Sequence, residues 1–290
     1  MAILYYIIFA IIYLISLLPF RALYLFSDFL NLVLFRMLGY REEIVLTNLR
    51  RSFPEKSSAE IQRIRKSFNR YFCDLIVESV KTLSISPASL SKRVHFQNKS
   101  LFEKYYEANQ SLILVLGHLG NWELMGAAFA PLPYHKLFVI YHPLRNQIFD
   151  RLLYYMRTRL GNDLYPMKET FQGMVANRDQ VTATAFIADQ TPSPVNAYWT
   201  TFLHQDTPVY TGTERIAQKL GYPVIYMSTR MPKRGTYLIE AKVITDHPNE
   251  TKPGEISEQH TRMLEQDILE QPEIWLWTHR RWKHHKRQTN

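Results

Sequence analysis

The chain has 290 residues, of which 46% are hydrophobic and 21% are charged, so it can bury a sizeable core and is not globally disordered. Its formal net charge of +9 indicates an anionic partner, such as a membrane surface, a phosphorylated ligand, an acidic protein or nucleic acid. The single cysteine, Cys73, excludes an intrachain disulfide and a cysteine-based zinc site.

The first apolar stretch covers residues 2–20, which include no charged side chain. A helix of this length spans about 28 Å, close to the thickness of the hydrocarbon core of a bilayer. No Lys or Arg precedes the stretch and no small-residue cleavage site follows it, which disfavours a cleaved signal peptide. We therefore expect a transmembrane anchor over residues 1–21 rather than a signal peptide or a soluble core helix.

Residues 22–84 are expected to form interfacial and amphipathic helices. The stretch 22–38 is apolar but carries Asp28 and Arg36, which is typical of an interfacial helix rather than a second span. Residues 58–83 have apolar side chains at helical spacing, which predicts a helix packed on the body of the protein. Because the first basic residues all follow the anchor, the positive-inside rule places the body in the cytoplasm.

A Ser- and Pro-rich segment at 84–91 is the expected linker to an α/β domain over residues 92–290. Strand-like segments in this domain lie at 112–116, 137–141, 181–188, 224–228 and 237–244. Helix-like segments lie at 122–130, 146–160, 168–177, 212–220 and 256–269. The alternation predicts a mixed, largely parallel sheet flanked by helices.

The sequence Gly-His-Leu-Gly-Asn-Trp-Glu at 117–123 follows the first of these strands and places His118 at its carboxyl end. Ligands bind at this end of the strands in open α/β sheets. A neutral imidazole can take a proton from an attacking hydroxyl, and Glu123 could accept the other ring N–H and fix the tautomer. The structural alternative is a histidine at a helix start, with Glu123 as a carboxylate of the first turn.

Other catalytic patterns are absent from the sequence. It has no Gly-x-Ser-x-Gly elbow, no P-loop, no Gly-x-Gly-x-x-Gly and no pair of histidines at zinc-binding spacing. We therefore expect direct, base-assisted transfer to an acceptor, without a metal or a cofactor.

The motif at 118–123, together with six further segments in order, resembles the lipid A biosynthesis (lauroyl/myristoyl) acyltransferases of the His-x4-Asp/Glu glycerolipid acyltransferase superfamily. The six segments are 48–55, 141–146, 157–161, 188–190, 211–212 and 272–283. The resemblance implies transfer of a fatty acyl chain from an acyl carrier protein thioester to a hydroxyl of a lipid A precursor-like glycolipid. It also implies location at the bacterial inner membrane, with the catalytic domain on the cytoplasmic face.

Carried over residue by residue, the resemblance implies His118 as the general base and Glu123 as its partner. Arg159 is the first candidate for binding an anionic substrate and Arg157 the second, and Asp189 could hold Arg159 in place. The expected substrate-binding set is completed by Gln190, Asn121, His142 and Arg145. His142 stands where the family usually carries Arg or Lys, so a phosphate contact there would be weaker and dependent on pH.

Three alternatives remain open from the sequence: a membrane lipid esterase or thioesterase, an acyltransferase for an amino- or glycerolipid, and a non-catalytic lipid-binding protein. The basic segment 280–287 is expected to contact anionic headgroups or substrate rather than nucleic acid. Trp275, Trp277 and Trp282 suit an interfacial aromatic belt, although Trp275 fits a core equally well. For 198–203, core packing is favoured over a role in lining an acyl channel.

Overall fold

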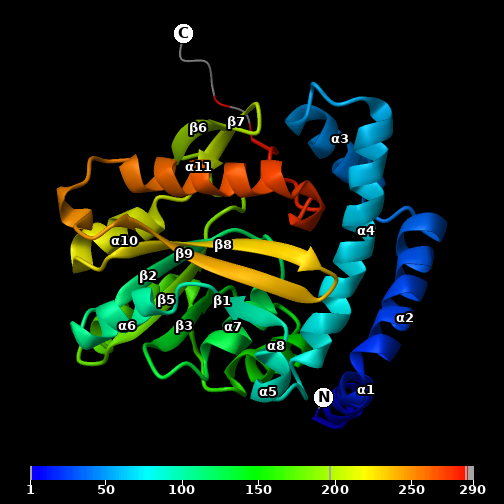
Figure 1. Cartoon of the computed structure of the whole chain (residues 1–290), viewed down its shortest axis with the longest axis horizontal. Helices are drawn as coiled ribbons and strands as arrows, with labels where there is room; N and C mark the ends of the chain where they lie inside the picture. The colour runs from blue at the N-terminus through cyan, green and yellow to red at the C-terminus, as the bar shows by residue number, and fades with distance from the viewer. Residues whose placement is uncertain (1, 196, 285, 287–290) are drawn as a thin grey trace.

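Figure 1 shows the computed structural model of the chain, which describes residues 2–195, 197–284 and 286. A seven-stranded sheet with the order β1-β9-β8-β2-β5-β3-β4 forms its centre. The strands are β1 (Val94–Phe96), β2 (Leu112–Leu116), β3 (Lys136–Tyr141), β4 (Asp163–Pro166), β5 (Thr182–Ile187), β8 (Val224–Lys233) and β9 (Thr236–Thr245). Within this sheet, β8 and β9 pair antiparallel and the other neighbours pair parallel, so the prediction of a mixed, largely parallel sheet is confirmed.

Helices cover both faces of the sheet. The central strand β2 is buried throughout, with Ile113 and Val115 in one hydrophobic cluster and Leu112, Leu114 and Leu116 in another. The first cluster also contains residues of α9 (Thr170–Ala176), α10 (Gly212–Leu220) and α11 (Glu255–Glu270). The second contains residues of α5 (Pro87–Leu90), α6 (Ser100–Glu107) and α7 (Trp122–Phe129). This two-sided burial explains why the strand is a continuous apolar run.

The segment predicted as a linker is instead part of the packed body. It contains the short helix α5, and Ile85 and Leu90 on either side of the helix start are buried in the second cluster. Ser86 caps the helix by accepting a hydrogen bond from the backbone N–H of Ser89. Serine and proline here mark a helix start rather than a flexible connection.

The amino-terminal helices are α1 (Ala2–Leu17), α2 (Phe20–Asn31), the π-helix η1 (Leu32–Met37), α3 (Glu42–Ser52) and α4 (Ser58–Lys81). The expected single anchor helix is interrupted at Pro19, which lacks the N–H that would continue α1 and instead precedes α2. No single helix of the described residues is long and apolar enough to cross a membrane. The two consecutive helical segments Leu4–Leu17 and Phe20–Met37 are together long and apolar enough, by length and composition alone, but the chain bends by 115° between them.

The long helix α4 joins these helices to the sheet. A capping box formed by Ser57 and Glu60 begins it, and its apolar face, including Phe68 and Tyr71, is buried, so the predicted amphipathic helix is confirmed. In Figure 1, α4 runs past the ends of β8 and β9, with α2 packed on its outer side.

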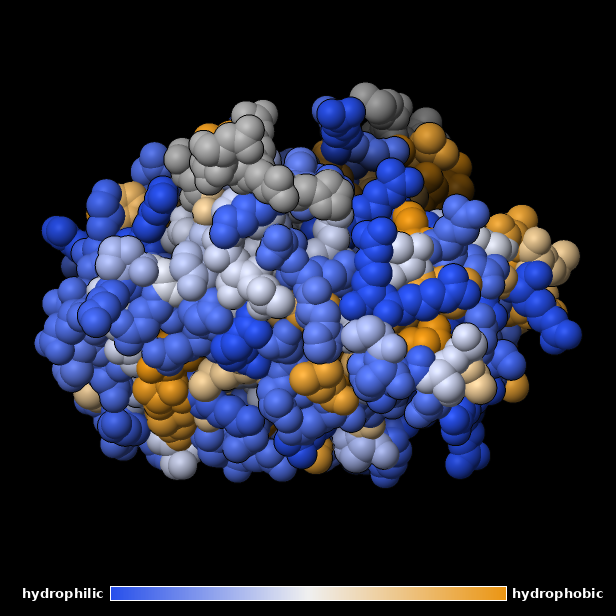
Figure 2. Space-filling view, turned by 90° about the horizontal axis from the view of Figure 1, so that it is seen from above, coloured by the Kyte–Doolittle hydropathy of each residue, from blue (hydrophilic) through white to orange (hydrophobic). Residues whose placement is uncertain are grey.

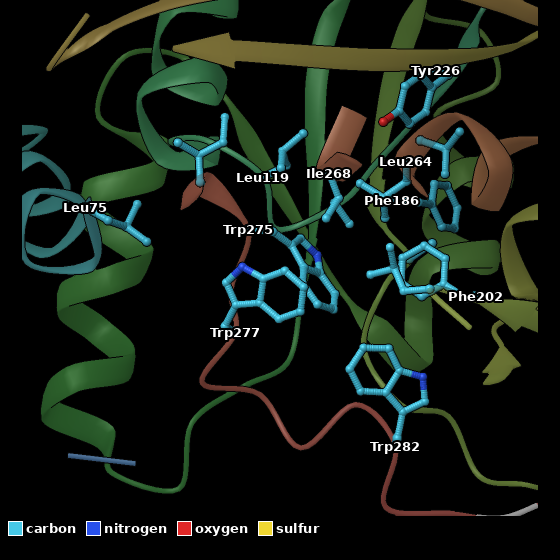
Figure 3. Packing of buried hydrophobic residues seen from close by; sticks show 14 of the residues in the cluster. Leu75, Leu119, Phe186, Phe202, Tyr226, Leu264, Ile268, Trp275, Trp277 and Trp282 are labelled. Carbon is cyan, nitrogen blue, oxygen red and sulfur yellow. The ribbon is translucent and has the colours of Figure 1, made fainter. Parts of the chain in front are cut away.

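The carboxyl-terminal segment closes the core against the hairpin of β6 (Tyr198–Phe202) and β7 (Gln205–Val209) (Figure 3). Trp275, Trp277 and Trp282 are buried there, so the prediction of an interfacial belt was wrong. Their indole N–H groups find internal acceptors on Asp189, Pro272 and Thr207, which makes full burial possible.

Two other segments that allowed competing interpretations from the sequence, 198–203 and 280–287, also contain buried residues. Phe202 and Leu203 are buried in the same core, in keeping with the packing role favoured for 198–203. Arg281 is also buried, contrary to the expectation for the basic tail, and donates a hydrogen bond to the carbonyl of Pro208. Two members of that tail, His285 and Arg287, lie outside the described residues.

Candidate active site

His118 lies in a short loop between β2 and α7 that the carboxyl-terminal segment holds from outside. Leu119 forms an isolated antiparallel bridge with Trp275, and the N–H of Gly120 donates to the carbonyl of Ile274 at 2.9 Å. Gly120 has a φ of +62°, and a Cβ there would come within 2.4 Å of Thr229. Only glycine fits this turn without strain, which explains its place in the motif.

One carboxylate, that of Asp189, holds the imidazole in place. The backbone N–H of His118 donates to Asp189 Oδ2 at 2.8 Å, and His118 Nδ1 lies 2.6 Å from Asp189 Oδ1. The indole of Trp275 donates to Oδ2 at 2.8 Å. Burial alone would raise the pKa of Asp189, but the nearby His118 and these hydrogen bonds lower it to about 2. The ionised carboxylate favours the tautomer with hydrogen on Nδ1, which leaves the Nε2 lone pair available.

Strand order explains why Asp189 rather than Glu123 is the partner of His118. β5 lies beside β2, with Leu116 opposite Ile187, so the residues that follow the two strands emerge side by side. Glu123 sits instead in the first turn of α7, and its carboxylate pairs with Arg157 of α8 (Gln147–Thr158). Arg157 donates from Nε at 3.0 Å and from Nη2 at 2.5 Å. The expected contact between Glu123 and the His118 ring is therefore corrected.

Arg159 is also not placed as expected. It donates hydrogen bonds to the carbonyls of Thr82 and Ile85, just beyond the end of α4, and makes no contact with Asp189 among the described residues. Basic side chains commonly satisfy free carbonyls at a helix end. Arg159 thus joins α8 to α4 and lies outside the cavity beside His118, whereas Arg157 lines that cavity.

The cavity beside His118 has a volume of about 330 Å³. Its polar lining includes Gln190, whose Nε2 lies 3.3 Å from His118 Nε2, and Trp122 packs edge-on against the imidazole at 4.7 Å. Most of the remaining wall is apolar, from Ile140, Leu144, Leu153, Met167, Phe186, Ile187, Ala188 and Ile216. The lining also includes the polar side chains of Tyr141, Asp150, Thr170, Tyr210 and Thr213. The Nε2 edge of the imidazole, beside the Gln190 amide, thus faces a chamber that combines apolar walls with polar groups.

Of the three other predicted binding residues, His142 lines the cavity beside His118, whereas Arg145 and Asn121 do not. His142 lines the same cavity but is exposed, and its Nδ1 lies 3.0 Å from the carbonyl of Pro143. Arg145 is exposed on the loop after β3 and does not line the cavity. Asn121 is buried and caps α7 by accepting from the N–H of Leu124, so its side chain is structural rather than a substrate contact.

A second, narrow cavity of about 60 Å³ lies between α7 and the sheet, and the sequence reasoning did not predict it. It shares Trp122, Ile140, Arg157 and Ile187 with the larger cavity. The rest of its wall is almost entirely apolar, from residues such as Leu114, Met125, Gly126, Ala127, Leu137, Met156 and Ala185. The Glu123–Arg157 pair lines it as well, at the side that adjoins the larger cavity. The small residues 126–128 of α7 were the only sequence signal for this space.

A buried carboxylate, Glu78 of α4, is a further residue that sequence reasoning missed. It accepts hydrogen bonds from the side chains of Tyr24 (2.8 Å), Asn121 (2.8 Å) and Tyr237 (2.7 Å). Burial raises the pKa of Glu78, and the three donors oppose that rise. Glu78 therefore links α2, α4 and β9 to the residue that begins α7 beside the candidate base.

Among the described residues, no group of three or more His, Cys, Asp or Glu side chains is arranged to hold a metal ion. The residues that the structure brings together at the larger cavity are His118, Asp189, Gln190, Arg157 and His142. This arrangement can remove a proton from a group that enters the cavity, and it can accommodate an apolar chain beside that group.

The family model described as bacterial lipid A biosynthesis acyltransferase matches residues 1–284. A search of curated proteins returned no match.

Proposed function

We propose the acyl donor, the general base and the reaction site for this chain, which belongs to the bacterial lipid A biosynthesis acyltransferases and is thus an acyltransferase for a lipid A-type glycolipid. The donor is an acyl carrier protein thioester and the acceptor is a hydroxyl of the glycolipid. The observation that carries the proposal is the His118–Asp189 pair, which lies beside a cavity that is large and mostly apolar.

In the proposed step, the oxygen of the acceptor hydroxyl attacks the thioester carbonyl, and His118 Nε2 takes the proton of that hydroxyl. Asp189 stabilises the imidazolium that forms, through the Nδ1–H bond. The tetrahedral intermediate then expels the carrier thiolate, which receives the proton from the imidazolium. The products are the acylated lipid and the free thiol, and His118 returns to its neutral state. The amide of Gln190 is a donor beside the reacting position.

The two cavities suggest where each substrate portion lies. The narrow apolar cavity adjoins the larger one through Trp122, Ile140, Arg157 and Ile187 and, at about 60 Å³, has room for only a short part of the acyl chain. The larger cavity, which has more polar groups, suits the reacting carbonyl and the acceptor. Glu123 then acts through Arg157, by holding that guanidinium in the wall between the two spaces.

We further propose that the protein associates with the bacterial inner membrane, with the site on the cytoplasmic face. The helices α1, α2 and η1 carry large exposed apolar side chains, among them Leu4, Ile7, Ile11, Leu14, Leu25, Phe29 and Met37, and Leu38 directly after η1 is exposed as well. In Figure 2 the visible face is mostly hydrophilic, and hydrophobic residues gather toward the right, on the side where Figure 1 places α2.

This apolar surface lies close to the proposed site. The ring of Phe9 in α1 meets Tyr155 of α8 edge-on at 5.5 Å, and the guanidinium of Arg151 lies 4.5 Å from the ring of Tyr5. Since α8 also lines the larger cavity through Leu153 and Arg157, a lipid in the bilayer would reach the cavity over a short path. The net charge of +9 would attract both an acidic carrier protein and an anionic lipid.

The test uses purified full-length protein with an acyl carrier protein thioester, with and without the glycolipid acceptor. Acceptor-dependent release of thiol, together with acylated lipid, supports transfer. Release without acceptor would favour an esterase or thioesterase, and no release under either condition would favour a binding protein. His118→Ala should lower turnover by about 10²–10⁴ without loss of the fold. Near-normal turnover in the folded variant would contradict the mechanism.

A further inference from the structure

A second large groove lies between η1, α2 and α4. It has a volume of about 1030 Å³ and shares no lining residue with the cavity beside His118. Its walls come from Asp28, Asn31, Leu32, Phe35 and Arg36 of α2 and η1, from residues 65–74 of α4, and from Met231, Arg234 and Glu273. The groove is therefore separate from the proposed catalytic site.

The groove carries an excess of positive charge. Its basic residues are Arg36, Arg65, Lys66, Arg70 and Arg234, and its acidic residues are Asp28, Asp74 and Glu273, which gives five cations against three carboxylates. Arg234 and Arg70 together balance the two aspartates: Arg234 Nη2 lies 2.8 Å from Asp28 and 2.6 Å from Asp74, and Arg70 Nε lies 3.7 Å from Asp28. Arg65 pairs with Glu42, which lies outside the groove lining. Arg36 and Lys66 form no ion pair with any described residue. Lys66 and Arg70, one turn apart on α4, can approach the same anion.

A buried amide in the wall points independently to a ligand. Asn69 is 7% exposed, its side chain makes no hydrogen bond to any described residue, and its Oδ1 is fully shielded. Buried side-chain amides are normally satisfied, so this one calls for a partner. Nδ2 also makes no hydrogen bond to a described residue and is not fully shielded, so it can donate to an oxyanion held beside Lys66 and Arg70.

The surroundings indicate what carries this anion. Leu32 and Phe35 line the groove, and Leu25, Phe29, Leu32, Met37 and Leu38 are exposed on the helices that form its outer wall. A ligand with a phosphate group and an adjacent hydrocarbon chain would match both the basic residues of the groove and the apolar side chains beside it. We propose that this groove binds the phosphate headgroup of an anionic membrane phospholipid. The inference agrees with the proposed membrane association but does not rest on acyl-transfer chemistry.

The test measures binding by calorimetry on the full-length protein in a non-ionic detergent. The probes are dihexanoyl phosphatidylglycerol, dihexanoyl phosphatidylcholine and inorganic phosphate. Short-chain lipids separate the headgroup site from bulk membrane attachment. We expect phosphatidylglycerol to bind at least about tenfold more tightly than either other probe. Lys66→Gln/Arg70→Gln should weaken its binding about tenfold or more, as expected when two charge-assisted contacts are lost.

Two matched variants make the outcome decisive. Lys104→Gln/Arg178→Gln removes the same charge from exposed positions outside the groove and should bind as the parent does. Asn69→Leu removes a buried amide that has no partner, so it should weaken lipid binding while the melting temperature is kept or raised.

Other outcomes would overturn the proposal or its lipid assignment. Unchanged binding in the Lys66/Arg70 variant would overturn the site. Equal binding of phosphatidylcholine would show that the anionic headgroup is not recognised. Equal binding of inorganic phosphate would assign the groove to free phosphate instead of lipid. His118→Ala should bind phosphatidylglycerol normally, which keeps the result distinct from any failure of the catalytic proposal.

Discussion

Asp189 accepts hydrogen bonds from both the backbone N–H and the ring Nδ1 of His118, so a single carboxylate fixes the position and the orientation of the imidazole. The contact follows from the pairing of β2 with β5, because the two residues follow neighbouring strand ends. In the proposed mechanism, a base held in its working orientation loses less free energy to reorganisation during the reaction.

Asp189→Asn is expected to lower kcat by about 10²–10⁴, with little change in KM, because an amide cannot hold the Nδ1–H tautomer as the carboxylate does. Steady-state kinetics with the carrier thioester would measure the effect, and a melting curve would confirm the fold. Asp163→Asn, at an exposed ion pair with Lys136, is the matched control and should retain parental kinetics. A parental kcat in folded Asp189→Asn would remove this residue from the mechanism.

Glu123→Gln is expected to destabilise the fold by about 3 kcal/mol, because it leaves the guanidinium of Arg157 largely buried without its counter-charge. The double variant Glu123→Gln/Arg157→Gln should recover part of this loss, since neither charge then remains unpaired. Chemical denaturation of the single and double variants would measure the coupling. Additive losses in the double variant would show that the pair makes no net contribution.

The buried His260 should make stability fall in mild acid. Burial lowers the pKa of His260 from 6.5 to about 4, so the unfolded chain binds its proton more readily than the folded chain. The stabilisation is therefore complete above pH 6.5 and is lost as the pH falls toward 4, by about 3 kcal/mol. Denaturation at a series of pH values should show this slope, and His260→Leu should flatten it. An unchanged slope in the variant would assign the acid sensitivity to other groups, such as His279, whose pKa burial also lowers to about 4.

Glu78 should produce a slope of opposite sign. Burial raises the pKa of Glu78 in the folded chain, so its contribution to stability is greatest below pH 4.5 and declines as the pH rises. Glu78→Gln lacks this ionisation, and its stability relative to the parent should increase from pH 5 to pH 8. Glu78→Leu should instead cost about 3 kcal/mol or more, because Tyr24, Asn121 and Tyr237 lose their acceptor. A constant difference between Glu78→Gln and the parent would contradict the pKa shift.

Membrane association can be tested without removing α1, which also packs on the body through Phe9 and Ile12. Ile7→Ser/Ile11→Ser/Leu14→Ser changes only exposed positions of α1 and should shift much of the protein from the membrane pellet to the supernatant. The control Val195→Ser/Val243→Ser/Leu269→Ser alters exposed apolar positions elsewhere and should stay with the pellet. Equal partitioning of the two variants would remove α1 from the attachment surface.

The sequence predicted the elements that have a strong local pattern and missed the contacts that depend on strand order. Apolar periodicity located β2, β5 and α10 within a residue or two, because burial on a sheet face dictates it. The partner of His118 was not predictable, because Asp189 lies 71 residues away and meets it only through the β2–β5 pairing.

Local features of the sequence also misled the interpretation in two places. Glu123 is close to His118 in sequence, but the helical turn directs its carboxylate to Arg157. The tryptophans of the carboxyl-terminal segment looked interfacial from composition, whereas internal acceptors on Asp189, Pro272 and Thr207 allow their burial.

The bridge between Leu119 and Trp275 bears on how the enzyme is made. During translation the ribosome releases α1 and α2 long before residues 274–276, which brace the histidine loop and donate to Asp189. The loop that holds His118 therefore lacks this support until the last part of the chain has been made. The arrangement around His118 and Asp189 is thus complete only after this last segment has docked.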